Sequence, residues 1–289
     1  MTESTRDKIY AIAYFARRNT LASIAVIMLA VFAGFAVFAD LIAPHDPFKS
    51  TDETFQPPSF QHVFGTDDLG RDVFSGVIYG ARTSIIIGIS VSVLSGLIGV
   101  IVGSTAGFAG GYLDDLLMRL TELILIPPRF FLALVIAALF GSSMVNLIVI
   151  LTLTYWTTTA RLVRSEVLSL KERPFVEASR AMGAREARIL FREIIPNAMP
   201  VIVTNVTLMV GSVILLEAAL DFIGISDGNR ISWGAMLHNG QHFIRDGWWM
   251  IVFPSLALTL LVISVNVLAD MLNNWLDPKS RSMQFNQSI

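Results

Sequence analysis

Apolar residues are gathered along the chain into blocks that are close in length to a bilayer-spanning helix. A helix that crosses the hydrocarbon core needs about 20 predominantly apolar residues at a rise of about 1.5 Å per residue. Six segments meet this requirement: residues 20–43, 84–108, 116–140, 144–163, 198–223 and 250–269. The third is interrupted by Pro127 and Pro128. The pattern predicts an all-α integral membrane protein with six transmembrane helices.

The polar segments between these blocks divide the chain into five parts. We expect a cytoplasmic N-terminal tail (1–19), a first transmembrane helix (20–43), an extracytoplasmic loop (44–83), a core membrane domain (84–275) that includes a cytoplasmic loop (164–197), and a cytoplasmic C-terminal tail (276–289).

Basic residues indicate which side of the membrane each part faces. The N-terminal tail and residues 161–192 are rich in Lys and Arg, and the C-terminal tail carries Lys279 and Arg281. The first long loop is instead acidic. Because cytoplasmic segments carry an excess of Lys and Arg, both termini and residues 161–192 are predicted to be cytoplasmic.

Composition excludes a soluble globular domain and sites built on cysteine, and it gives no support for nucleic-acid binding. Of the 289 residues, 54% are hydrophobic and 15% are charged, whereas a soluble domain carries about 25% charged residues. Lys and Arg (21) nearly balance Asp and Glu (23), so no overall field favours nucleic acid as a partner. The absence of cysteine excludes disulfides and thiolate metal sites.

The motifs of catalysis and of nucleotide binding are absent from the sequence. No G-x-x-x-x-G-K-[ST] phosphate loop is present, and the glycine-rich "GSTAGFAGG" (residues 103–111) is better suited to close helix packing. His238 and His242 stand four residues apart, but no carboxylate accompanies them in a metal-binding pattern. We therefore expect neither an enzyme nor a metal site.

The loop between the fourth and fifth predicted spans has the local signals of a helical hairpin. Pro174 suits the first turn of a helix, Glu177 lies near its positive end, and Gly183 can adopt the left-handed conformation that ends it. Residues 184–195 form a second, basic amphipathic stretch before Pro196. The residues alone leave two interpretations open: a solvated connector, or a surface on which a partner docks.

Here the sequence resembles a known family. Glu177-Ala178-Ser179, then Gly183, then Ile195-Pro196 resemble the E-A-A…G…I-x-L-P signature of permease subunits in binding-protein-dependent ABC importers. Ser179 and Glu193 depart from that signature, which usually has Ala and Ile there. The resemblance implies a type I ABC importer permease fold, in which this loop is the coupling helix that docks on the ATPase subunit. The residues implied in coupling are Pro174, Glu177, Ala178, Ser179, Ala181, Gly183, Ala184 and Pro196.

Segments outside the loop point to one subfamily of these permeases. "FGTDDLGRDVFSGVIYGARTS" (64–84) is similar to a segment of the dipeptide/oligopeptide/nickel permease subfamily, as are "LLEAALDFIGI" (215–225), "SWGAML" (232–237) and "NVLADMLNNWLDP" (266–278). The long first loop resembles that of the C-type permease. The residues implied in docking of the binding protein are Asp67, Asp68, Arg71 and Asp72.

The resemblance also implies partners and a location. The partners are a B-type permease subunit, one or two ABC ATPase subunits and an extracytoplasmic solute-binding protein, in the lipid bilayer of a bacterial or archaeal cytoplasmic membrane. ATP and Mg²⁺ would be bound by the ATPase subunits, so no cofactor is expected in this chain. The implied solutes are peptides or a related small solute.

Polar residues within the predicted spans are candidates for the translocation path, because burying an ionisable group in a bilayer costs about 2.5–3.5 kcal/mol. Glu217, with Asp221 one turn further on, either lines a path or makes a contact between helices. Arg129 either satisfies backbone carbonyls freed by the prolines, extends to the interface, or binds an anion. Asn205 is expected to join helices or to line the path.

Two functions therefore compete. The leading hypothesis is a permease subunit of an ATP-driven importer without enzymatic activity of its own. The alternative is a secondary transporter driven by an ion gradient, a class that usually has inverted repeats and broken helices at the midplane.

Overall fold

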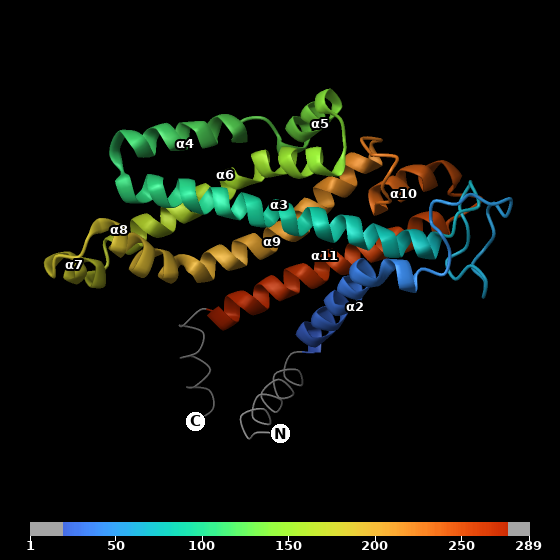
Figure 1. The fold of residues 1–289 in the computed structure, drawn as a ribbon, viewed down its shortest axis with the longest axis horizontal. Helices are drawn as coiled ribbons and strands as arrows, with labels where there is room; N and C mark the ends of the chain where they lie inside the picture. The colour runs from blue at the N-terminus through green and yellow to red at the C-terminus, as the bar shows by residue number, and fades with distance from the viewer. Residues whose placement is uncertain (1–19, 277–289) are drawn as a thin grey trace, which may run out of the picture.

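The computed structural model describes residues 20–276, and every regular element in that range is helical (Figure 1). The prediction of an all-α membrane protein is confirmed at this level. The elements are α2 (Thr20–Ile42), α3 (Val73–Ala109), α4 (Gly111–Leu125), α5 (Arg129–Phe140), α6 (Met144–Lys171), α7 (Pro174–Ala181), α8 (Glu186–Ile189), the π-helix η1 (Leu190–Ile194), α9 (Ile195–Phe222), α10 (Trp233–Gly240), the 3₁₀ helix η2 (Gln241–Phe243) and α11 (Trp249–Leu276).

Four helical segments of the described chain are long and apolar enough to cross a membrane: α2, α3, the run Glu186–Phe222 and α11. The third predicted span is instead a broken pair, α4 and α5, bent by 78° and counting as a fifth crossing only if the pair crosses as one. α6 is 28 residues long, but its second half carries threonines and charged residues. The structure thus supports four or five crossings, and the sixth stays a prediction.

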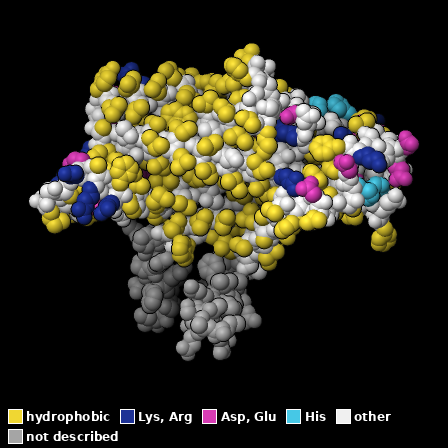
Figure 2. Space-filling model, viewed as in Figure 1, with side chains coloured by type: hydrophobic (Ala, Val, Ile, Leu, Met, Phe, Trp, Pro, Cys, Tyr) yellow, Lys and Arg dark blue, Asp and Glu magenta, His cyan; other side chains and the backbone are white. Residues whose placement is uncertain are grey.

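The surface is divided between an apolar middle and charged ends. Figure 2 shows hydrophobic side chains covering the middle of the molecule, over α3, α4 and α6. Lys and Arg gather at the end where α7 and α8 lie, and Asp, Glu and His gather with further basic residues at the opposite end. Large apolar side chains such as Ile101 and Leu139 are exposed, as expected of a surface that faces lipid or partner helices.

Small residues bring α3 and α6 into close contact. A Cβ atom built on Gly99 would lie 2.5 Å from Cβ of Thr159, and one on Gly103 would lie 2.3 Å from the carbonyl oxygen of Ala160. Both distances are too short for any side chain larger than hydrogen. The predicted packing role of the glycine-rich segment is therefore confirmed at Gly103.

Two tryptophans fix the other end of the molecule. The indole nitrogen of Trp233, at the start of α10, donates to the carbonyl oxygen of Val77 in α3 (2.9 Å). The indole nitrogen of Trp249, at the start of α11, donates to the carbonyl oxygen of Thr66 (2.9 Å). Both rings are buried. Trp233 thus joins α10 to the first half of α3, and Trp249 joins α11 to the loop of residues 43–72.

Several predicted boundaries differ from the helix ends. α3 begins at Val73 rather than near Ser84, because the Asp72 carboxylate accepts a hydrogen bond from the backbone N–H of Ser75 and caps the helix. α6 continues to Lys171, so the connecting loop starts later than residue 164. The predicted tails, 1–19 and almost all of 276–289, lie outside the described residues.

Candidate functional site

α7 forms at the position that its sequence signals predict. Pro174 is its first residue, and Gly183, two residues beyond its last, Ala181, has a left-handed φ of +80°. There the N–H of Gly183 donates to the carbonyl of Arg180 (2.9 Å) and the N–H of Ala184 to that of Ser179 (3.1 Å). This pair of bonds is a Schellman motif. The chain therefore reverses direction sharply after α7.

α7 buries one face and exposes the other. Val176 and Ser179 point inward and are buried. The outward residues are exposed, and they include Pro174, Phe175, Glu177, Ala178, Ala181 and Met182. Small side chains alternate there with one carboxylate and two large apolar groups. Such a surface can be approached closely by another protein.

The inner face of α7 is joined to the next helix by a side-chain hydrogen bond. The Ser179 hydroxyl donates to the Glu193 carboxylate (2.7 Å). Glu193 lies in η1, where the π-helical turn precedes Pro196, a residue that cannot donate a backbone hydrogen bond. The Asn197 side chain donates to the carbonyl oxygen of Glu193 (2.6 Å). Ser179 and Glu193, the two departures from the signature, are therefore partners.

The hairpin formed by α7, α8 and η1 (residues 174–194) is connected firmly to the rest of the molecule through α6. Arg164 makes a two-pronged ion pair with Asp114 of α4, at 2.5 and 2.6 Å. The Lys171 ammonium donates to the carbonyl oxygen of Phe108 near the end of α3 (2.8 Å). The part of α6 that leads into the hairpin is therefore held against α3 and α4.

A second group of charges lies at the opposite end, where α9 ends. The Arg230 guanidinium donates to Glu217 (2.8 Å) and to Asp221 (2.6 Å). The Ser232 hydroxyl donates to the other Asp221 oxygen, and the Ser84 hydroxyl lies 3.4 Å from Glu217. Both carboxylates are fully buried, and the Arg230 side chain is 8% exposed. The Arg230 guanidinium thus pairs with two buried carboxylates.

This arrangement gives Glu217 a contact between parts of the chain, which is the second of the two roles considered for it, and its place on the translocation path stays a prediction. Its carboxylate lies inside the helix packing with Arg230 and does not face an open passage within this chain. Asp221 is likewise a contact within the protein rather than a residue at the membrane edge. The sequence alone does not single out Arg230, which lies in the loop after α9. The one sequence feature that points to this contact is the similarity of both "LLEAALDFIGI" and "SWGAML" to one subfamily, since Asp221 of the first segment accepts a hydrogen bond from Ser232 of the second.

Arg129 and Asn205 both make contacts between helices. The Arg129 guanidinium lies 4.0 Å from the centre of the Tyr155 ring, in cation–π contact, and donates to the Thr158 hydroxyl (2.8 Å). The Asn205 side chain accepts a hydrogen bond from Thr159 (3.0 Å). Of the alternatives for Arg129, the geometry favours packing against α6. Asn205 joins α6 to α9.

The acidic loop does not present all of its predicted docking residues. Asp67 pairs with Arg71 (2.7 Å) and both are partly exposed. Asp68 is also partly exposed, and burial, followed by the neighbouring Asp67 charge, raises the pKa of its carboxyl. Asp72 is 4% exposed because it caps α3. The expectation that Asp72 lies on a docking surface is corrected by this burial.

A cavity of about 280 Å³ opens between this loop, the start of α3 and the segment that leads into α10. Asp67, Arg71, Arg230 and His238 contribute polar groups to its walls. His238 itself hydrogen-bonds to the Phe222 carbonyl (2.8 Å). The cavity makes this end of the molecule a concave, charged surface.

Comparison with known proteins identifies the family. Residues 99–282 match the family described as binding-protein-dependent transport system inner membrane component. Residues 14–58 match the N-terminal TM domain of oligopeptide transport permease C. The chain belongs to the binding-protein-dependent permease family. The resemblance found in the sequence is thereby confirmed.

Individual relatives of this permease cover nearly its whole length. The dipeptide transport system permease protein DppC of Bacillus subtilis is 38% identical over 92% of this chain and 84% of its own. The oligopeptide transport system permease protein OppC of the same organism is 37% identical, over 92% and 88%. The probable D,D-dipeptide transport system permease protein DdpC of Escherichia coli is 34% identical, over 92% and 88%.

Family membership establishes the general function. The permease is a multi-pass inner-membrane subunit of an ABC importer, a component that conducts solute rather than an enzyme. Membership of this family implies ATPase and binding-protein partners. It favours the ATP-driven hypothesis over the ion-gradient alternative.

Proposed function

We propose that this permease is the C-type half of a heterodimeric pathway that imports di- and oligopeptides, paired with a B-type permease. Relatives at 34–38% identity are named as dipeptide or oligopeptide permeases, which supports peptides as the solute class. Large apolar side chains exposed on several helices offer surface for a second permease as well as for lipid.

The hairpin of residues 174–194 carries this proposal, with α7 as the coupling helix. Its outward face offers Glu177, Ala178 and Ala181 without a partner in the described chain, while its inner face is attached through α6 to α3 and α4. A movement imposed on α7 by an ATPase subunit would therefore reach the transmembrane helices. Such a shift biases the pathway between two states.

The proposed topology is the type I importer fold with six spans, in which α6 and the α4–α5 pair each cross once. The hairpin end and both termini then face the cytoplasm, as the positive-inside rule predicts. The end that carries α10 and the loop of residues 43–72 faces outward. There Asp67, Asp68 and Arg71 would contact the binding protein, beside the cavity.

The division of labour between the subunits follows. One or two kinds of ATPase subunit would bind ATP and Mg²⁺, and this chain would hold neither. The binding protein would deliver the solute, and the permease pair would alternate between outward- and inward-facing states. The part of the chain from α3 to α11 would form the membrane core around the path.

Reconstitution tests this function. The complete complex is placed in proteoliposomes with ATP inside, and uptake of a labelled dipeptide is measured with loaded binding protein outside. We expect uptake that requires both ATP and binding protein and that unlabelled peptides compete away. Uptake that persists without ATP and collapses with an ion gradient would overturn the proposal. Competition by a different solute class alone would overturn the peptide assignment.

A further inference from the structure

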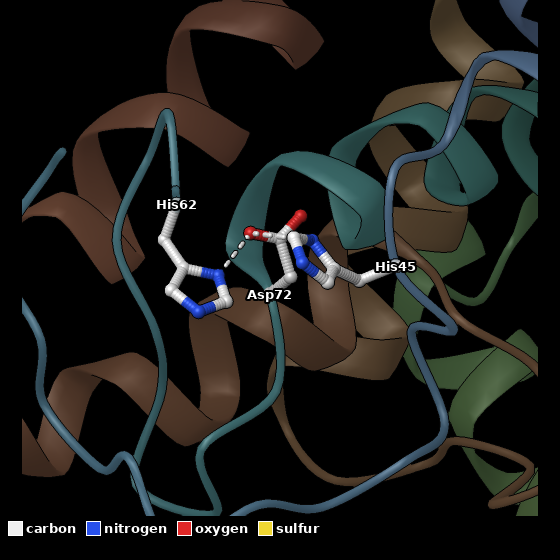
Figure 3. A group of neighbouring side chains, drawn as sticks. All are labelled: His45, His62 and Asp72. Carbon is white, nitrogen blue, oxygen red and sulfur yellow. Dashed lines mark hydrogen bonds and ion pairs between the residues drawn. The ribbon is translucent and has the colours of Figure 1, made fainter. Parts of the chain in front are cut away.

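Three potential metal ligands from separate parts of the chain meet in front of α3. His45 follows α2, His62 lies in the middle of the 43–72 loop, and Asp72 caps α3. Figure 3 shows the two imidazole rings on either side of the Asp72 carboxylate. One potential ligand atom from each residue lies within 4.8 Å of the others.

The distances suit a small cation. Asp72 Oδ1 lies 2.9 Å from Nδ1 of His62 and 3.8 Å from Nδ1 of His45. Two ligands of a tetrahedral zinc ion, each bound at about 2.0–2.2 Å, are about 3.3 Å apart. The two separations that involve Asp72 fall on either side of that value, and the ligand atoms of His45 and His62 lie within 4.8 Å of each other. The three side chains are therefore close enough to converge on one ion after small side-chain movements.

Neighbouring groups orient these ligands. The second Asp72 oxygen, Oδ2, accepts hydrogen bonds from the backbone N–H and the hydroxyl of Ser75, both at 2.7 Å. The helix end is thereby satisfied by Oδ2, and Oδ1 is left to face the imidazoles. The backbone N–H of His45 donates to the same Ser75 hydroxyl (3.2 Å). Metal sites are characteristically supported by such outer hydrogen bonds.

His62 is in an environment that one ring proton does not satisfy. Its Nδ1 faces Asp72, and its Nε2 lies 3.3 Å from a Glu53 carboxylate oxygen. A neutral imidazole has a single N–H, so when Nε2–H donates to Glu53, the Nδ1 lone pair points at an anionic oxygen. A cation bound to both atoms removes that repulsion. Histidine ligands that donate their second nitrogen to a carboxylate are typical of zinc sites.

We propose that His45, His62 and Asp72 bind a divalent transition-metal ion, with Zn²⁺ as the ion that best fits two imidazole nitrogens and one carboxylate oxygen. His62 and Asp72 are buried, whereas the His45 side chain is 40% exposed. The exposed side chain of His45 would give the ion an entry route. Bound metal ties the end of α2 and the middle of the loop to the start of α3.

The test is metal binding by the purified complex of permease and partner subunits. The complex is stripped with a chelator and titrated with Zn²⁺ alone against a chromophoric competitor. His45→Gln is the main variant, because the ring is partly exposed and the backbone bond to Ser75 is kept; His62→Gln is the second. His238→Gln is the matched control, since that histidine lies beside His242 at the same end of the molecule, outside the cluster.

We expect one Zn²⁺ per permease chain that the control retains and that either cluster variant binds at least about tenfold more weakly. Zn²⁺ should also raise the Tm of the wild-type complex but not of His45→Gln. Co²⁺ in place of Zn²⁺ should give the visible absorption bands of a tetrahedral ion. No stoichiometric binding to the wild type, or equal binding by wild type and His45→Gln, would overturn the site.

Discussion

Ser179 and Glu193, which both depart from the family signature, are hydrogen-bonded to each other at 2.7 Å across the hairpin. Ser179 is 8% exposed, on the inner face of α7, and Glu193 lies in the π-helical turn before α9. The signature's alanine and isoleucine would meet there as an apolar contact. This chain has a polar contact at the same place, so the two departures form one exchange.

Because Ser179 and Glu193 are partners, the effects of mutating them should be coupled. Ser179→Ala removes the donor from a partly buried carboxylate, and we expect it to cost about 1 kcal/mol, since Glu193 keeps some access to water. Ser179→Ala with Glu193→Ile restores the signature's apolar pair. ATPase stimulation by loaded binding protein should fall in either single variant and recover in the double variant. Additive losses would contradict the pairing.

Gly183 provides a test that separates backbone strain from steric contact. Nothing lies within 4 Å of a Cβ built at this position, yet φ is +80°. Gly183→Val should therefore disturb the turn through strain of about 1–2 kcal/mol or more, whereas Gly183→Asn should be tolerated because Asn adopts left-handed conformations. Peptide uptake should be lost in the first and kept in the second. Equal loss in both would show that the side chain, not the backbone, matters.

The bounds of α7 could be predicted because their causes are local. Pro174 sets the first turn, and Gly183 permits the left-handed end, so neither depends on distant parts of the chain. The start of α3 also has a local cause, the Asp72 cap, but the predicted apolar span begins only at Ser84. The turns before Ser84 carry Tyr79 and Arg82, whose polar groups are paired with Asp40 of α2, a contact that only the fold shows.

At the end of α9, removal of the Arg230 charge alone should destabilise the protein much more than removal of Arg230 together with the charges of Glu217 and Asp221. Arg230→Met would leave two buried carboxylates without their cation, which costs about 3–5 kcal/mol when one partner of a buried pair is removed. Adding Glu217→Gln and Asp221→Asn should restore much of the loss. The measurement is the Tm and yield of the purified complex. A stable Arg230→Met protein would show that the cluster is not closed as described.

The pairing of Arg230 with Glu217 illustrates what sequence reasoning lacks. The sequence shows that the carboxylates of Glu217 and Asp221 are costly in a membrane. It does not show that the compensating cation, Arg230, comes from the loop after α9. The same holds for His45, His62 and Asp72, which are separated along the chain and meet only in the fold. The break at Pro127 and Pro128 was visible in the sequence, but not the 78° bend.

Arg129 is predicted to be structural. Its guanidinium covers the Tyr155 ring and binds Thr158, so Arg129→Ala should reduce the amount and Tm of assembled complex. Arg129→Lys keeps a cation beside the ring and should lose less. In the complex that does assemble, the preference among peptides with free or amidated C-termini should be unchanged. A selective loss of peptides with a free carboxylate would show instead that Arg129 binds solute.

Contact between α7 and the ATPase tests the central claim most directly. The chain has no cysteine, so a single cysteine at Ala178, on the exposed face of α7, can carry a photoreactive group. Ser50, exposed in the loop at the opposite end, provides the matched control. We predict that the probe at position 178 cross-links to an ATPase subunit in the assembled complex and that the probe at position 50 does not. A probe at position 178 that misses the ATPase, while the one at position 50 reaches it, would contradict the account.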